Sequence, residues 1–192
     1  MGEAAAEPNP RRAWDVVLRI TVATAILLGG VFVLGSFFRE PLAAAGSHLY
    51  ESAGLVGISL LVLVCDPLPG LGFQPGLLLG TAANVPWALL FPVTALSSLM
   101  SSALGWGIGH AGRNNRTFLR FLSTTGASPA LARWGVRAVA LASITPLPYG
   151  LATMAAGSGG LPFRILLLAS TARWLKIAAS LAAIKTGWNL GA

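Results

Sequence analysis

Three charged side chains interrupt apolar stretches of the sequence and are its strongest candidates for chemistry. Asp66 ends one apolar run directly before Pro67, whereas Arg173 and Lys176 lie inside another run, three positions apart and therefore on one helix face. An arginine can hold a phosphate through two parallel hydrogen bonds, and a lysine adds a point charge. The pattern predicts a cationic site for a phosphate headgroup, with Asp66 as a site for a proton or a headgroup amine.

Other interpretations of these charges stay open. Asp66 is also suited to cap the backbone amides of the break before Pro67. Arg173 and Lys176 are able to snorkel to an interface or to pair structurally with Asp66. Arg164, near the start of the same run, is a fourth substrate candidate, and we expect it to mark the cytoplasmic end of that run.

The residues that usually carry catalysis do not form a recognisable set. The histidines are His48 and His110, the single cysteine is Cys65, and no acid follows Asp66. These residues have no metal-ligand spacing, and the sequence contains no phosphate-binding glycine loop. Ser158 lies in a Gly-Ser-Gly-Gly stretch that is typical of a connecting turn. We therefore expect no enzyme activity, no cofactor and no metal.

Composition places these residues in a membrane protein. Of 192 residues, 55% are hydrophobic and 10% charged, and the mean hydropathy is +0.72. A soluble domain carries roughly a quarter charged residues, so a soluble globular protein is excluded. The apolar stretches are continuous and show no period-two alternation, which favours helices over an outer-membrane barrel. We expect an all-α integral membrane protein, with membrane lipids as partners.

The charge distribution predicts the orientation. The formal net charge is +7, but the six acids all lie at or before Asp66. Residues 111–137 form a basic connector with interspersed apolar side chains, as expected of helices lying on an anionic inner leaflet. Nucleic-acid binding is excluded, because no room is left for a recognition fold. The arginines of the connector are Arg113, Arg116, Arg120, Arg133 and Arg137.

The N-terminal part predicts a tail and an anchor. Residues 1–12, rich in Ala, Pro and Glu, are expected to form a disordered cytoplasmic tail. Residues 13–38 contain an apolar run long enough to cross a bilayer as a first span, within one membrane domain covering 13–192. A cleaved signal peptide is the alternative. We expect the bacterial inner membrane, with the N-terminus in the cytoplasm.

The next apolar stretch is broken by prolines. Residues 43–52 read as an interfacial link, and the run 53–65 is too short to span a bilayer. A proline-rich break at membrane depth is typical of a re-entrant hairpin, which we place at 53–83. A span over 85–110 follows. The residues of the predicted hairpin tip are Pro67, Pro69 and Gly70.

Small residues recur every four positions along the span 85–110. Four small side chains on one face let a second helix approach closely, as in membrane helix pairs. We therefore predict a helix-packing stripe. Its residues are Ser97, Ser101, Gly105 and Gly109.

A second break repeats the pattern. Residues 138–159 predict a second re-entrant hairpin, and the span 162–187 opens with Pro162 as the span 85–110 opens after Pro86. If the connector 111–137 is cytoplasmic, the two hairpin-plus-span units have opposite topology, a recurring plan of secondary transporters. Ordinary proline-kinked spans are the alternative. The tip residues predicted here are Pro146, Pro148, Gly150 and Gly157.

These motifs resemble the DedA or SNARE-associated Golgi family, also called VTT-domain proteins, over residues 55–188. The carriers of the resemblance are the P-x-P-G break at 67–70, the G-W-G-I-G-H-A-G-R stretch at 105–113 and, most specifically, T-P-L-P-Y-G-L-A-T-M-A-A-G-S-G-G-L-P-F-R at 145–164. The resemblance implies two opposed re-entrant hairpins and the movement of phospholipids or polyprenyl-phosphate carriers across the bilayer, by a flippase- or scramblase-like route.

The chain departs from that family at positions tied to energy coupling. Leu71 and Ser59 stand where many bacterial members have acids, and Ser143 and Tyr149 stand where the family often has arginines. The chain therefore resembles a divergent branch. Proton coupling, with protons as a second partner, and movement driven by a gradient alone both stay open, as does a homo-oligomer. A non-transporting membrane scaffold or assembly factor is the alternative function.

Overall fold

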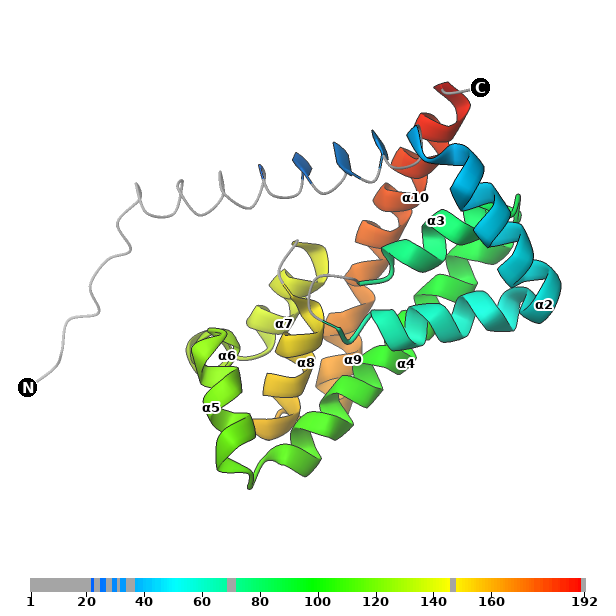
Figure 1. The fold of residues 1–192 in the computed structure, drawn as a ribbon. Helices are drawn as coiled ribbons and strands as arrows, with labels where there is room; N and C mark the ends of the chain where they lie inside the picture. Colours follow the sequence, from blue (N-terminus) through cyan, green and yellow to red (C-terminus); the bar gives the residue numbers. More distant parts are fainter. Residues whose placement is uncertain are drawn as a thin grey trace, which may run out of the picture.

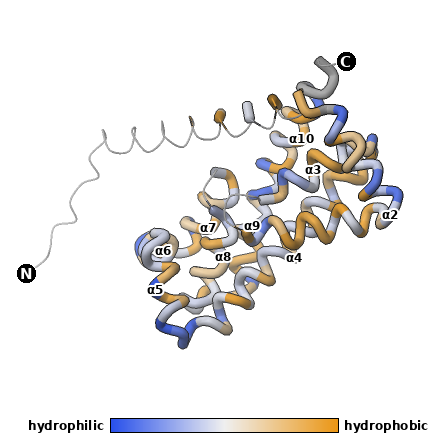
Figure 2. Tube along the Cα trace, in the orientation of Figure 1, coloured by the Kyte–Doolittle hydropathy of each residue, from blue (hydrophilic) through white to orange (hydrophobic). Residues whose placement is uncertain are grey.

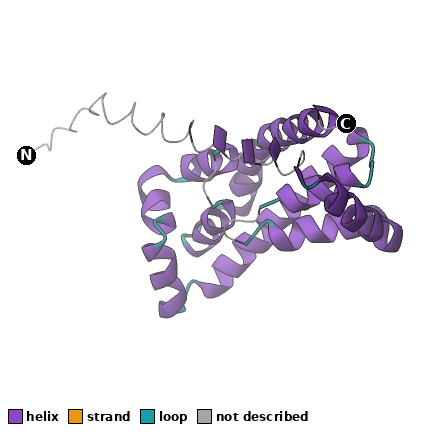
Figure 3. Ribbon diagram, turned by 45° about the horizontal axis from the view of Figure 1, so that its top comes forward, coloured by secondary structure: helices purple, strands orange, loops and turns teal. Residues whose placement is uncertain are grey.

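The computed structural model describes residues 37–68, 72–145 and 148–190, together with isolated positions between 22 and 33. This described part consists of helices joined by short turns and loops, and no strand occurs in it (Figure 3). The predicted tail 1–12, most of the predicted first span 13–38, and the predicted tip residues Pro69, Gly70 and Pro146 lie outside the described residues.

The helices form two groups joined by one long diagonal helix, α4 (Figure 1). Helices α2 and α3 lie at one end of α4, α5 to α8 lie toward its other end, and α10 runs back past α3. The helices are α2 (Arg39–Cys65), α3 (Gln74–Ala82), α4 (Trp87–Gly112), α5 (Arg116–Thr124), α6 (Ala127–Trp134), α7 (Val136–Ile144), α8 (Tyr149–Ser158), α9 (Phe163–Thr171) and α10 (Arg173–Leu190).

Three stretches are long and apolar enough to cross a membrane: Glu40–Cys65, Trp87–Gly112 and Phe163–Thr186. Hydrophobic positions extend along these helices, and hydrophilic ones lie at the α4–α5 turn and at several helix ends (Figure 2). Arg173 and Lys176 are exceptions, because they lie inside the third stretch. Large apolar side chains stay exposed on their outer faces, as lipid contact requires. They include Val56, Leu60 and Val64 on α2, Leu96, Met100 and Leu104 on α4, and Leu168 on α9.

Helix α2 differs from the sequence prediction. The residues 43–52, read as an interfacial link, are helical and join the run 53–65 across Gly54, which is not helical (φ 58°, ψ −147°). Glycine tolerates this positive φ because it has no Cβ. Gly135 has a similar conformation (φ 54°, ψ −133°) directly before α7. The run 53–65 is therefore a bent continuation of a preceding helix. In the predicted last span, residue 172 is a turn between α9 and α10.

The chain turns in the same way after α3 and after α8. Backbone amides of residues 83–85 donate to carbonyls of residues 79–81, and those of residues 159–161 donate to carbonyls of residues 155–157 in the same order. Both hydrogen-bond sets are of the kind that closes helix C-termini. The two segments thus share one local structure, although their sequences differ.

The helices that follow these turns also begin alike. Asn84 and Gly160 have positive φ angles of 57° and 75°. Pro86 then caps α4 with φ −54° and ψ 132°, and Pro162 caps α9 with φ −58° and ψ 132°. Proline suits this position because it needs no backbone donor. The correspondence runs from the end of each short helix into the following long one.

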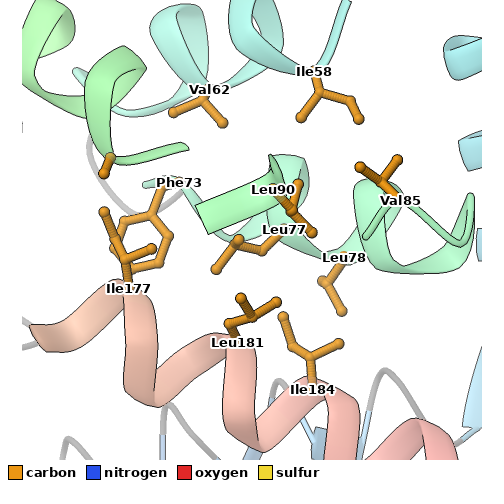
Figure 4. Close-up of a cluster of buried hydrophobic side chains, with 11 residues drawn as sticks. Ile58, Val62, Phe73, Leu77, Leu78, Val85, Leu90, Ile177, Leu181 and Ile184 are labelled. Carbon is orange, nitrogen blue, oxygen red and sulfur yellow. The ribbon is translucent and has the colours of Figure 1, made fainter. Parts of the chain in front are cut away.

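An apolar cluster holds α2, α3 and α10 together. Phe73 and Leu77 point toward Ile177 and Leu181 on α10, with Ile58 on the far side (Figure 4). Because lipid is as apolar as leucine, close packing, more than escape from water, stabilises such a cluster in a bilayer. A second cluster joins α7, α8 and α9 around Val139, Ala156 and Leu166.

Candidate functional site

The two halves of the fold meet at an ion pair. Asp66 directly follows α2, and the Nη2 of Arg173, the first residue of α10, donates to its Oδ1. The side chains are 0% and 3% exposed, respectively. A charge with so little solvent costs free energy unless it is paired. The contact joins the break after α2 to the start of α10, residues far apart in the sequence.

The second carboxylate oxygen of Asp66 also has a partner. The hydroxyl of Ser98 on α4 donates to Oδ2 at 2.7 Å. Ser98 belongs to a buried face of hydroxyl side chains on α4, together with Thr94, Ser97, Ser101 and Ser102. Asp66 therefore uses one oxygen for Arg173 and the other for α4.

Two aromatic rings enclose the guanidinium of Arg173. Its Cζ lies 3.9 Å from the ring centroid of Tyr149 and 5.0 Å from that of Phe73. Both distances fall within the range of cation–π attraction, which strengthens where water is excluded. Phe73 precedes α3 and Tyr149 begins α8. These two residues are as far apart in the sequence as Pro86 and Pro162. The breaks before α3 and α8 thus each contribute one ring.

The Tyr149 hydroxyl links three helices. It donates to the Ser170 hydroxyl on α9 and lies 2.7 Å from the Ser102 hydroxyl on α4. Ser102 and Ser170 each also donate to a carbonyl of their own helix. Tyr149 is 4% exposed. The Tyr149 ring therefore holds the Arg173 guanidinium in position, and the Tyr149 hydroxyl holds the ring in position.

Lys176 extends the cluster by one turn of α10. Its Nζ donates to the carbonyl oxygen of Thr145 at 2.8 Å and lies 6.0 Å from the Phe73 ring centroid. Thr145 follows α7, where the chain leaves the helix. A backbone carbonyl released by a helix break thus stabilises a buried ammonium.

The cluster holds more positive than negative charge. At ordinary ionisation, Arg173 and Lys176 face one carboxylate, that of Asp66. The Nε and Nη1 atoms of Arg173 are buried without a hydrogen-bond partner among the described residues. Guanidinium carries five donor hydrogens, and buried donors left unpaired are costly. The arrangement suits an added anion with several acceptor oxygens.

The two breaks touch beside this cluster. A Cβ placed on Gly150 would collide with the backbone carbonyl of Pro67. Gly157, predicted as a tip residue, lies instead near the end of α8, where its Cα packs against the α4 backbone at Trp106 and His110. Pro148 is exposed and caps α8. Of the described tip residues, Pro67 and Gly150 are brought together.

The small-residue stripe on α4 is buried along its length. Gly105 and Gly109 face Thr153 and Met154 of α8, and a Cβ at either glycine would clash there. The Ser97 hydroxyl pairs with that of Ser59 on α2 at 2.6 Å. The stripe thus contacts helices on both sides of α4.

Arg164 is apart from the cluster. It is exposed in the first turn of α9, and the nine helical steps to Arg173 correspond to about 13 Å along an ideal axis. Sequence reasoning did not assign site roles to Phe73, Ser98, Tyr149 and Ser170. The run of hydroxyl side chains on the buried face of α4 is the available signal for Ser98, and the aromatic residue directly before α3 or at the start of α8 is the signal for the two rings.

Comparisons of the chain with protein-family models, curated proteins and solved structures found no match. Among the described residues, His, Cys, Asp and Glu side chains form no group that could hold a metal ion.

Proposed function

We propose that this chain is a membrane transport protein that moves a phospholipid or polyprenyl-phosphate-type amphiphile across the bilayer. The observation that carries the proposal is the excess positive charge of the buried cluster, with two unpaired nitrogens on Arg173. A phosphate offers acceptor oxygens and a compensating negative charge. Arg173 and Lys176 bind the headgroup in this scheme.

Asp66 has a second role in the scheme. The ion pair of Asp66 with Arg173 stabilises the cationic site when no substrate is bound. When a phosphate binds, the interaction between Asp66 and Arg173 must weaken. Because Asp66 and the headgroup are both anions, they compete for the same guanidinium. This competition weakens headgroup binding enough for release, which transport requires.

The proposed architecture is a pair of inverted repeats, each a re-entrant hairpin followed by a span. Its support is the shared turn geometry after α3 and α8, the matching proline caps, and the contact between Pro67 and Gly150. Packing between the two units further supports this architecture, since the short helix of each unit packs on the long helix of the other. Helix α3 packs on α10, and α8 packs on α4. Broken helices of this kind expose backbone groups and dipole ends inside a bilayer.

We place the protein in the bacterial inner membrane, with its N-terminus and the connector 111–137 in the cytoplasm. The arginines of α5, α6 and their flanks are exposed, as the positive-inside rule and an anionic leaflet favour. The resemblance to DedA and VTT-domain proteins supports lipids as the substrate. Gradient-driven and proton-coupled movement remain alternative mechanisms within this proposal.

The test is lipid movement in proteoliposomes that contain this chain alone. Vesicles with fluorescent phosphatidylglycerol in both leaflets are treated with an impermeant quencher, with and without a pH gradient. We expect quenching beyond the outer-leaflet half in wild-type vesicles, and loss of it for Arg173→Gln. Quenching limited to the outer leaflet, whatever the gradient, would favour the scaffold. The matched control is Arg120→Gln, an exposed arginine on α5.

A further inference from the structure

A cavity lies beneath α6, between that helix and the α7–α8 hairpin. Its volume is about 120 Å³, and an engineered apolar cavity of about 150 Å³ holds one benzene molecule. The side chains around it are apolar except for that of Thr125. The lining includes Ala130, Leu131, Ala142, Pro148, Leu151 and Ala152.

The cavity adjoins the charged cluster through consecutive residues. Pro148 lines the cavity, and the next residue, Tyr149, packs its ring on Arg173. The apolar cavity and the cationic cluster therefore lie on two sides of the same two residues, Pro148 and Tyr149. A ligand that contacts both must be an amphiphile, with hydrocarbon in the cavity and an anionic group at Arg173.

Helix α6 forms the roof of the cavity and is weakly held. None of its side chains is fully buried, and Gly126 and Gly135 at its two ends have positive φ angles of 78° and 54°. Few buried contacts mean a low free energy of local opening. On the other side of α6 lies a second, larger hollow bounded by Ser158 and Pro162, and Leu131 lines both.

We propose that the cavity beneath α6 binds a segment of the hydrocarbon chain of the transported amphiphile, about as large as benzene, and that α6 is its movable cover. The inference rests on the proposed function for the identity of the headgroup. The chain enters from the larger hollow past Leu131, which separates the two spaces, and the headgroup reaches Arg173 on the far side of Pro148 and Tyr149.

The experiment uses the full-length protein in vesicles of phosphatidylethanolamine and phosphatidylglycerol. The probe is a phosphatidylglycerol with a photoactivatable diazirine in the middle of one acyl chain, and labelled peptides are identified by mass spectrometry. Ala152→Phe fills the cavity from α8. Ala130→Phe fills it from the exposed roof and keeps the test valid if the α8 variant misfolds. Ala179→Phe, exposed on α10, is the matched control.

We expect labelling of α6 and of residues 138–152, reduced about tenfold by each cavity-filling variant, equivalent to about 1.4 kcal/mol, and unchanged in Ala179→Phe. Labelling confined to the outer faces of α4 and α9, or unaffected by both cavity variants, overturns the inference. Transport is measured on the same samples. If the cavity is labelled but no lipid is transported, the proposed function is refuted and the binding site is retained. If both cavity-filling variants transport lipid at the wild-type rate, only the binding site is refuted.

Discussion

Gly150 packs directly on the backbone of Pro67, so that the two helix breaks of the chain touch with no side chain between them. Pro67 follows Asp66, and Gly150 follows Tyr149. The contact therefore brings the Asp66 carboxylate and the Tyr149 ring to the same guanidinium, that of Arg173. The geometry of the charged cluster depends on how closely these two breaks approach.

Gly150→Ala is expected to destabilise the protein by about 1–3 kcal/mol. The added Cβ collides with the Pro67 carbonyl, and overpacking of a tight contact costs roughly that amount. Alanine's better helix propensity recovers at most about 1 kcal/mol. The measurement is the thermal unfolding midpoint of purified protein in one detergent.

Gly107→Ala on α4 is the matched control, because a Cβ there has no neighbour within 4 Å. This variant should be neutral or more stable by about 0.5–1 kcal/mol, through helix propensity alone. If Gly150→Ala unfolds at the same temperature as Gly107→Ala, the two breaks are not in backbone contact.

Removing the charge of Asp66 is expected to cost about 3–5 kcal/mol. Asp66→Asn leaves Arg173 buried and uncompensated, the usual source of such large losses. Combining it with Arg173→Gln should recover part of the loss, because the two residues are coupled. Unfolding midpoints of both single variants and the double variant give the coupling.

Glu51→Gln, an exposed acid on α2, serves as the control for lost negative charge and should change stability by no more than about 0.5 kcal/mol. Strictly additive effects of Asp66→Asn and Arg173→Gln would show that the ion pair contributes nothing.

Much of the helical framework follows from the sequence. Continuous apolar runs predict membrane helices, and Pro67, Pro86, Pro148 and Pro162 lie at breaks or helix starts, because proline lacks the amide that a helix interior needs. The pairing of Asp66 with Arg173 is one of the alternatives that the sequence leaves open. A buried arginine needs an acidic partner, and the sequence contains few acids, so composition alone limits which acid can pair with Arg173.

Other features depend on tertiary contacts that periodicity cannot reveal. The bend at Gly54 joins two helical pieces where the sequence indicated a link and a short run. The mildly polar residues 43–52 are compatible with an interfacial helix as well as with a loop. The placement of Phe73 and Tyr149 around one guanidinium requires the two breaks to meet in space. No local pattern encodes that distance.

Tyr149→Phe is expected to cost only about 1 kcal/mol, the usual net value of a hydrogen bond. Ser102 and Ser170 both keep their carbonyl partners on α4 and α9, and the phenyl ring still faces Arg173. Tyr149→Leu should cost more, since it also loses the cation–π contact. Equal losses in the two unfolding midpoints would mean that the ring does not stabilise the arginine.

Single cysteines in a Cys65→Ser background test the topology. Ser128→Cys on α6 should resist an impermeant thiol reagent added to intact cells if the arginine-rich connector lies in the cytoplasm, as the positive-inside rule predicts. His48 is exposed on α2, close to Gly46, and Gly46 packs on the turn after α3. The variant His48→Cys should react with the reagent from outside. Labelling of both positions from the same side would overturn the inverted arrangement.

The last prediction separates a phosphate-binding role of Arg173 from a purely structural one. Arg173→Lys keeps the positive charge for Asp66 but lacks the planar fork, so it should retain most of the stability while losing transport of phosphatidylglycerol. Lys176→Arg keeps both charge and hydrogen-bonding capacity toward Thr145 and should transport. Transport rate and unfolding midpoint are measured on the same purified variants. If Arg173→Gln and Lys176→Gln both move lipid at the wild-type rate, the cations do not bind the headgroup. Their excess charge would then need another anion, such as a second subunit's carboxylate.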